Sequence, residues 1–190
     1  MSLFNFQEVV WQAKEINAPV TGKATLNIST AAGDKISKLS PLLNDLCEGH
    51  CIYFMTDGAW SNIDIVKKLI DICGPCSMDF CTWSISTDAI RKFTQWQQDG
   101  LITDLHVLLD QGLRNRKPEI FQQAILTFKN LKLLKCHAKV AVLQNEHFSF
   151  TIIGSANFTN NPRKEAGMII RNRAIANDNI AWIRKEFENA

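Results

Sequence analysis

The 190-residue sequence has no run of about 20 consecutive apolar residues, because charged residues interrupt every apolar run within a few positions. It therefore predicts no membrane-spanning helix. The first residues, MSLFNFQEVVWQAKEINAP, also lack a basic segment followed by an unbroken apolar segment and a small-residue cleavage site, which argues against a secretory signal. From these two absences we expect a cytoplasmic protein without a membrane anchor.

A strong charge of either sign is also missing, since 21 Lys and Arg residues against 19 Asp and Glu residues give a formal net charge of +2. This balance excludes a protein that coats nucleic acid through a global positive charge, so any affinity for polyanions must be local. With 46% hydrophobic residues the chain is not of the disordered class. No low-complexity linker or internal repeat divides it, and we expect a single domain over residues 1–190.

The six cysteines do not form a recognisable disulfide or metal framework. The quartet Cys73-Gly74-Pro75-Cys76 resembles the thioredoxin motif, but it follows a helix-like segment and precedes a strand-like one, the reverse of the order in such a redox site. A zinc site at Cys73, Cys76 and Cys81 would need a fourth ligand, and no second tight pair has the usual spacing. We expect reduced, mostly buried thiols, with no metal and no cofactor.

From about residue 51 onward, short apolar runs alternate with segments of helical period, which predicts strands joined by crossover helices and an α/β fold. The expected strands cover residues 23–29, 51–56, 78–84, 105–109, 131–134, 138–143, 148–153 and 166–170. The expected helices cover residues 6–15, 36–46, 61–72, 88–98, a segment that starts at Pro118, and 178–188. The short polar link between residues 143 and 148 predicts a hairpin.

Polar residues gather around this hairpin. His137 and Lys139 are two positions apart on the first strand, so we expect the imidazole and the ammonium to project from the same face. Gly154, Ser155 and Asn157 follow the second strand, where the glycine allows a close backbone approach and the other two supply neutral donors. Cleaving a phosphodiester without a metal requires a nucleophile, a proton donor and groups that hold the charged oxygens, and the hairpin offers all three types.

Glu165 lies beyond the loop, just before the next expected strand. A carboxylate in this place is expected to accept a hydrogen bond from the imidazole of His137 and so to fix its tautomer.

The order His137-x-Lys139, Gly154-Ser155-x-Asn157 and Glu165 resembles the signature of the phospholipase D superfamily, H-x-K-x4-D followed by G-S-x-N. The resemblance implies an α/β/α sandwich with a mixed sheet. Gln144 stands where the signature has aspartate. In the superfamily that aspartate mainly supports a turn, and the tyrosyl-DNA phosphodiesterase branch also lacks it.

Members of this superfamily normally use two copies of the motif, whereas this chain has one, because none of the other histidines is followed by lysine two positions later. It therefore resembles the short bacterial nucleases of the family, which implies a homodimer formed through the H-x-K site. The resemblance further implies that His137 of one subunit attacks phosphorus while His137 of the partner subunit protonates the leaving oxygen. Lys139 of both subunits would neutralise the non-bridging oxygens.

Basic residues near the motif are candidates for binding the backbone of a nucleic acid. Arg163 and Lys164 lie between Asn157 and Glu165, and Arg114 and Arg116 lie in an expected basic loop. The tryptophans are expected to pack in the core or in the dimer interface; they are Trp60, Trp83 and Trp96.

The sequence therefore predicts a metal-independent phosphodiesterase, most specifically a nuclease that forms a phosphohistidine. One alternative is a catalytically weak DNA-binding module with the same cleft. A second alternative is a phospholipid-hydrolysing enzyme, which the absence of an amphipathic basic helix and of a large apolar loop disfavours.

Overall fold

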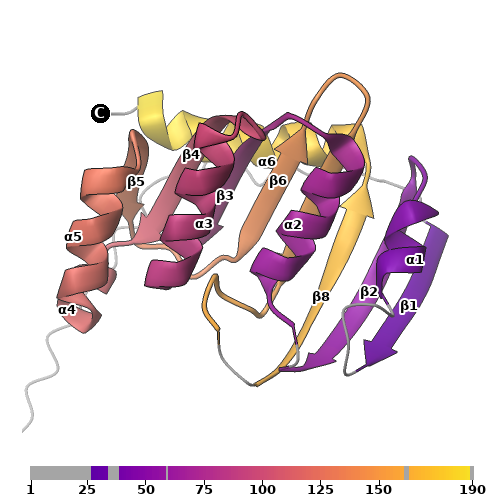
Figure 1. The fold of residues 1–190 in the computed structure, drawn as a ribbon, viewed down its shortest axis with the longest axis horizontal. Helices are drawn as coiled ribbons and strands as arrows, with labels where there is room; N and C mark the ends of the chain where they lie inside the picture. The colour runs from indigo at the N-terminus through magenta and orange to yellow at the C-terminus, as the bar shows by residue number, and fades with distance from the viewer. Residues whose placement is uncertain (1–26, 34–38, 59, 161–162, 189–190) are drawn as a thin grey trace, which may run out of the picture.

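The structure is a computed structural model that describes residues 27–33, 39–58, 60–160 and 163–188. Within these ranges the chain forms one sheet of eight strands and six helices (Figure 1). The strands are β1 Asn27–Gly33, β2 His50–Asp57, β3 Cys76–Thr82, β4 Ile102–Asp110, β5 Asn130–Leu134, β6 Val140–Gln144, β7 Ser149–Gly154 and β8 Lys164–Arg171. The helices are α1 Leu39–Asn44, α2 Asn62–Cys73, α3 Thr87–Gln98, α4 Leu113–Arg116, α5 Pro118–Thr127 and α6 Arg173–Glu188.

The sheet is mixed, with the strand order β1-β2-β8-β7-β6-β3-β4-β5. Parallel pairing joins β1 to β2 and runs from β3 through β4 to β5. Between these two parallel groups lie β8, β7 and β6, each antiparallel to its neighbours. The expected α/β class and the expected hairpin, which is the β6–β7 pair, are confirmed.

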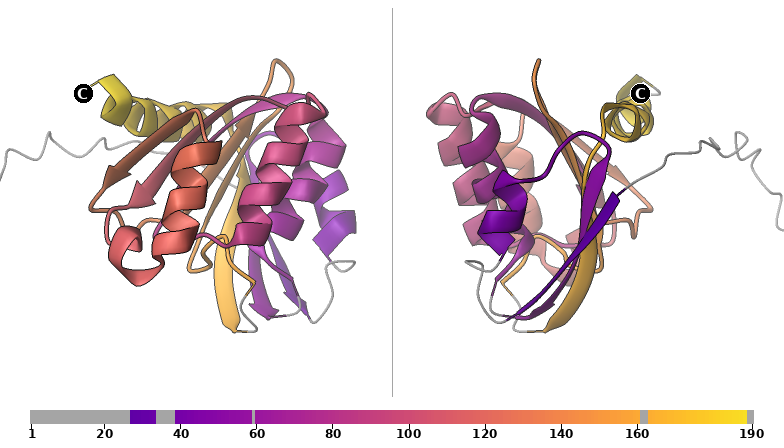
Figure 2. Two further views of the ribbon diagram at one scale, coloured as in Figure 1. Left: turned by 60° about the vertical axis from the view of Figure 1, so that its left-hand side comes forward. Right: turned by 90° about the vertical axis from the view of Figure 1, so that its right-hand side faces the viewer.

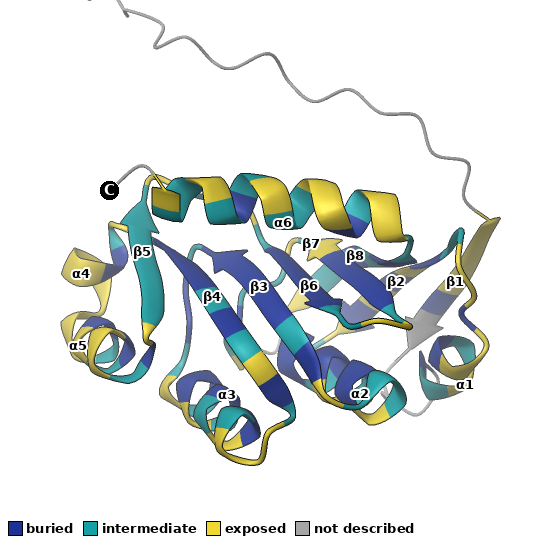
Figure 3. Cartoon of the chain, turned by 90° about the horizontal axis from the view of Figure 1, so that it is seen from above, coloured by how far each residue is buried: buried dark blue, intermediate teal, exposed yellow. Residues whose placement is uncertain are grey.

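Helices lie on both faces of this sheet (Figures 2 and 3). On one face, α1, α2, α3 and α5 cover the main core, and strand residues such as Ile52 and Phe54 point into it. Tyr53 and Met55, which alternate with these residues along β2, are exposed on the other face. This period-two alternation places the main core beneath the helices that connect the strands.

The helix α6 covers part of the other face and forms a second, smaller core with the sheet. Its residues Ala176 and Ile183 pack with Cys81, Val140 and Val142. None of the described helices is long and apolar enough to cross a membrane.

A buried ion pair also joins α6 to β3. The side chain of Asp79 is 1% exposed, and its two carboxylate oxygens accept from Nε and Nη2 of Arg184 at 2.8 and 3.0 Å. The hydrogen bond to Asp79 raises the pKa of Arg184 further. On β4, Nδ1 of His106 lies 3.5 Å from the same carboxylate. Burial of this kind makes the carboxylate dependent on its cation.

Several expected elements differ in extent from the observed ones. The helix expected over residues 36–46 is α1, which ends earlier, at Asn44, while residues 36–38 lie outside the described residues. The helix expected over residues 178–188 is α6, which begins earlier, at Arg173. The earlier start follows from Asn172, whose side-chain oxygen accepts from the backbone N–H of Ile175 at 3.0 Å and so caps the first turn. The expected helix over residues 6–15 and the first part of the expected strand over residues 23–29 lie outside the described residues.

The basic segment after β4 was expected to be a loop, and this is wrong: it contains the short helix α4. Backbone hydrogen bonds close this turn, because Arg116 donates to the carbonyl of Gly112 at 3.1 Å and Lys117 donates to that of Leu113 at 2.9 Å. Leu113 is fully buried and fixes the turn against the core.

Candidate active site

The residues of the candidate site come together at one edge of the sheet, where β3, β4 and β7 end and β6 and β8 begin. The pairing Cys81↔Val140 sets the start of β6 beside the end of β3, and Gly154↔Gly167 sets the end of β7 beside β8. The orange segment that leads into β8 lies along this edge in Figure 1. In open α/β sheets, ligands bind beyond the carboxyl ends of the strands.

His137 and Lys139 lie in the segment that precedes β6, and not on the strand itself as expected, because β6 begins at Val140. They nevertheless lie side by side: Nζ of Lys139 is 3.4 Å from Nδ1 of His137 and donates to the His137 carbonyl at 2.7 Å. The backbone N–H of Cys136 donates to Oδ2 of Asp110 at 3.3 Å, which holds this segment against the end of β4. The imidazole is exposed, and its Nε2 has no hydrogen-bond partner among the described residues.

Lys139 is partly buried, and burial lowers its pKa. The nearby Cys136, Cys81, Glu165 and Asp110 oppose this effect without cancelling it. The ammonium therefore stands in a partly desolvated place, where its attraction for an anion is stronger than in bulk water.

Gly154 is needed for close packing of two strands. A Cβ atom at this position would lie 2.8 Å from the carbonyl oxygen of Ala166 and 3.1 Å from Cα of Gly167. The backbone N–H of Gly154 also donates to the carbonyl of Lys139 at 3.2 Å. The close approach expected for this glycine is therefore present, although it is made to β8 rather than to a ligand.

Glu165 was expected to accept a hydrogen bond from the imidazole of His137, and this is wrong. Its carboxylate accepts from the hydroxyl of Ser155, and no hydrogen bond between Glu165 and His137 occurs in the described part of the chain. The reason is the strand order, because Glu165 lies in β8 and β7 separates that strand from β6. The backbone N–H of Ser155 donates to the Ala166 carbonyl at 3.0 Å, and the Ala166 N–H donates to the Ser155 hydroxyl oxygen at 3.1 Å, which holds the same turn.

Asn157 is fixed in an orientation that leaves its amide N–H₂ group available. Its Oδ1 accepts from the backbone N–H of Ser84 at 3.2 Å and lies 3.2 Å from the Thr82 hydroxyl, which also faces the Ser84 carbonyl at 2.9 Å. Because a backbone donor holds the oxygen, the nitrogen takes the other position, and Nδ2 donates to no described residue. A neutral donor with this freedom suits the oxygen of an anion.

Trp83 extends the site on the side of β4, a position that the sequence reasoning assigned to packing. Its ring centroid lies 5.6 Å from that of His137. The guanidinium of Arg116 lies 3.9 Å above the Trp83 ring, donates to the Trp83 carbonyl at 2.8 Å and pairs with Asp110 at 2.8 Å. The signal in the sequence was its place directly after a strand, at the edge where the motif residues also lie.

The other expected substrate-binding cations make fewer contacts. Lys164 lies 3.7 Å from Asp57, with both side chains largely exposed, while Arg114 and Arg163 are exposed. Of the four basic residues, the structure thus brings Arg116 next to the imidazole through Trp83 and leaves the other three on the surface.

Gln144, at the signature's aspartate position, lies at the opposite end of β6 from the candidate site. Its Nε2 donates to Ser149 at 3.2 Å and to Asn177 of α6 at 2.9 Å. The glutamine therefore ties the hairpin to α6, and the departure from the signature does not alter the surroundings of His137.

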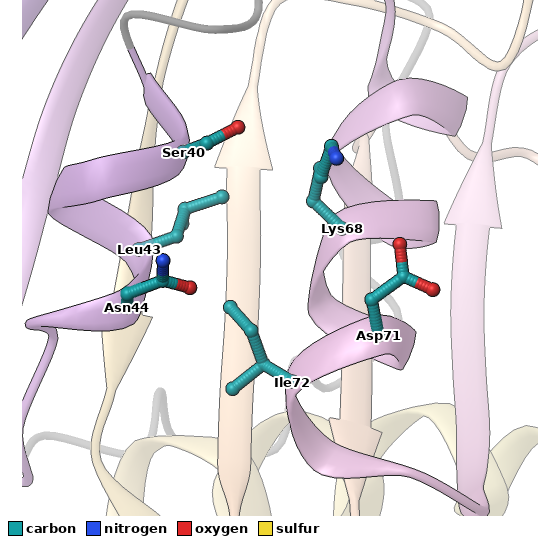
Figure 4. A pocket seen from close by; sticks show the side chains of 6 residues that line it. All are labelled: Ser40, Leu43, Asn44, Lys68, Asp71 and Ile72. Carbon is teal, nitrogen blue, oxygen red and sulfur yellow. The ribbon is translucent and has the colours of Figure 1, made fainter.

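A pocket elsewhere in the molecule contains none of these residues. It lies between α1 and α2 and is lined by Ser40, Leu43, Asn44, Lys68, Asp71 and Ile72 (Figure 4). Among the described residues, no group of three His, Cys, Asp or Glu side chains is placed to hold a metal ion. No protein-family model matches the sequence, and no curated protein matches it either.

Proposed function

We propose that this chain is a metal-independent phosphodiesterase with a phospholipase D-like fold, that it acts on nucleic acid, and that two copies form the active site. The observation that carries the proposal is the contact between His137 and Lys139, in which an exposed imidazole and a partly buried ammonium lie 3.4 Å apart. A nucleophile next to a cation is the minimum that attack on a phosphodiester requires. The free amide of Asn157 at the same edge would add a donor for a non-bridging oxygen.

One subunit supplies only one imidazole, and the reaction needs two roles. The attacking His137 forms the N–P bond through Nε2, and the ester oxygen leaves with a proton from His137 of the partner subunit; water then cleaves the N–P bond by the reverse path. The attacking imidazole must carry its proton on Nδ1, which makes this atom a hydrogen-bond donor. Because the ammonium of Lys139 is also a donor, Nδ1 must exchange its contact with Nζ of Lys139 for a contact with an acceptor. Lys139 retains its 2.7 Å bond to the His137 carbonyl in that case.

An exposed apolar surface next to the site supports the dimer. Register pairs set Met168 of β8 between Tyr53 of β2 and Ile153 of β7, so the three share one face of the sheet. Tyr53 and Ile153 are exposed, as is Met55 on the same face. The described helices leave this part of the sheet uncovered, because α6 crosses it elsewhere (Figure 2). Ile153 adjoins Gly154, so this apolar row ends at the candidate site.

The catalytic test uses bis(p-nitrophenyl) phosphate and single-stranded DNA in the presence of EDTA. We expect wild type to hydrolyse the ester and His137→Asn to be slower by a factor on the order of 10³ or more, since one residue serves as both nucleophile and acid. His147→Asn is the matched control, because His147 is an exposed histidine at the far end of the hairpin. Hydrolysis that persists in His137→Asn would refute the proposal, and DNA binding without cleavage by wild type would replace it with a binding module.

The dimer test compares two exposed positions. Tyr53→Asp should lower both the sedimentation coefficient and the activity, because a charge is placed in the apolar row. Leu126→Asp on α5 should change neither, although Leu126 is the more exposed residue at 84%. An active monomer of either variant would contradict the shared active site.

A further inference from the structure

Two cysteines lie directly behind the candidate site. Cys81 is fully buried near the end of β3, and Cys136 is half-buried in the residue position before His137. Both pack in the small core beneath α6. Neither is part of a disulfide, so the pair is in its reduced form.

The surroundings divide the two thiols into different roles. The neighbouring Cys81 thiol lowers the pKa of Cys136, and the nearby Lys139 also lowers it, against the opposing effects of burial and Asp110. The neighbouring Cys136, together with burial, raises the pKa of Cys81. Cys136 is therefore the nucleophilic thiolate with access to solvent, and Cys81 is the protected thiol next to it.

We propose that Cys81 and Cys136 form a dithiol site that hydrogen peroxide oxidises to a disulfide, and that this oxidation displaces His137. The Cys136 thiolate attacks one peroxide oxygen, so that an S–O bond forms as the O–O bond breaks and hydroxide leaves. The sulfur of Cys81 then attacks Cys136, the S–S bond forms, and a second hydroxide leaves. The two thiol protons convert the two hydroxides to water; both sulfurs are oxidised and the peroxide is reduced.

The disulfide would act on the site through the chain. Formation of the S–S bond brings the two sulfurs to about 2.05 Å, and Cys136 is joined to His137 by one peptide unit. A shift of about 1 Å in a catalytic group can cost on the order of 100-fold in rate. Oxidation also removes the thiolate charge that partly offsets the lowered pKa of Lys139. We therefore expect the oxidised protein to be at least roughly tenfold slower.

A second close pair in the chain provides an internal control. Cys73 and Cys76 are three positions apart in the chain, and Cys76 opens β3 at the end opposite to Cys81. Five residues of strand separate the two pairs by roughly 16 Å. Oxidation of Cys73 and Cys76 is therefore expected to leave the candidate site unchanged.

The experiment treats the full chain with hydrogen peroxide and maps its disulfides by non-reducing peptide mass spectrometry. We expect a peptide that links Cys81 to Cys136, with the loss of two hydrogens, absent from Cys136→Ser and from Cys81→Ala, and restored to free thiols by dithiothreitol. Absence of this linked peptide from wild type, with Cys136 still free or over-oxidised, would overturn the inference. This readout uses wild type alone, so it stands even if a cysteine variant fails to fold.

The effect on catalysis rests on the proposed function and is measured separately. Peroxide should reversibly lower hydrolysis of bis(p-nitrophenyl) phosphate in wild type and in Cys73→Ser, but not in Cys81→Ala. A disulfide that forms without any loss of rate would refute the control of His137. If reduced wild type hydrolyses nothing, the proposed function fails while the disulfide map still decides the oxidation site.

Discussion

Replacement of Arg184 by leucine should leave the carboxylate of Asp79 buried without its cation. Both carboxylate oxygens are bonded to the guanidinium, and the Asp79 side chain is 1% exposed, so the guanidinium supplies donors that water does not supply in the folded protein. Breaking a buried pair on one side typically costs about 3–5 kcal/mol. Because the Arg184 side chain is 39% exposed, so that its removal admits some water, we expect the lower end, about 3 kcal/mol.

The assay is urea unfolding at neutral pH, followed by a thermal melt. A loss of about 3 kcal/mol corresponds to a fall in Tm of roughly 6–12 °C for a domain of this size. Arg91→Leu is the matched control, because Arg91 pairs with Asp88 on the surface of α3 with 75% of its side chain exposed. A surface pair of this kind contributes at most about 1 kcal/mol.

A double variant completes the test. Asp79→Leu combined with Arg184→Leu removes both charges and should recover most of the loss, since apolar residues can replace a buried ion pair at little cost. If Arg184→Leu costs no more than Arg91→Leu, or if the double variant is as unstable as the single one, the carboxylate does not depend on Arg184 as reasoned here.

Two further predictions concern the site. Gly154→Ala should destabilise the fold by about 1–3 kcal/mol and lower kcat/KM, because its Cβ would lie 2.8 Å from the Ala166 carbonyl; unchanged urea midpoint and rate would contradict this. Lys139→Met should be more stable than wild type near neutral pH, because burial lowers the pKa of Lys139 and folding therefore disfavours its charged form. Between this lowered pKa and the ordinary value of 10.5, the unfolded wild-type chain binds more protons than the folded one, so wild-type stability rises with pH. The difference in urea midpoint between Lys139→Met and wild type should therefore narrow over this pH range. A difference that stays constant with pH would refute the prediction.

The local elements of this fold follow from local sequence signals. The connecting helices show a helical apolar period, and α2 has a Ser61 and Asp64 capping box that marks its start. The hairpin was predictable from its short polar link. The strand order was not, because the pair β2–β8 joins residues as far apart as His50 and Arg171, and no local pattern specifies such a pairing.

The candidate site shows the same division. The contact between His137 and Lys139 was predicted from their spacing on a strand. In the structure the two residues instead lie in the segment before β6, which a hydrogen bond to Asp110 holds in place. The predicted hydrogen-bond partner of Glu165 was wrong, because this partner depends on which strand lies between β6 and β8. Trp83 was missed for a similar reason, since its contact with His137 requires the ends of two strands to meet.

The position of β8 has a consequence for biosynthesis. This strand enters the sheet between β2 and β7, and its pairing residues end at Arg171, so β2 keeps an unpaired edge until the chain has been synthesised as far as this residue. An open strand edge invites pairing with other chains, and contacts between distant residues form slowly. Nascent or prematurely terminated polypeptides that end before residue 164 should therefore aggregate, and the full-length protein should depend on chaperones while it is being made.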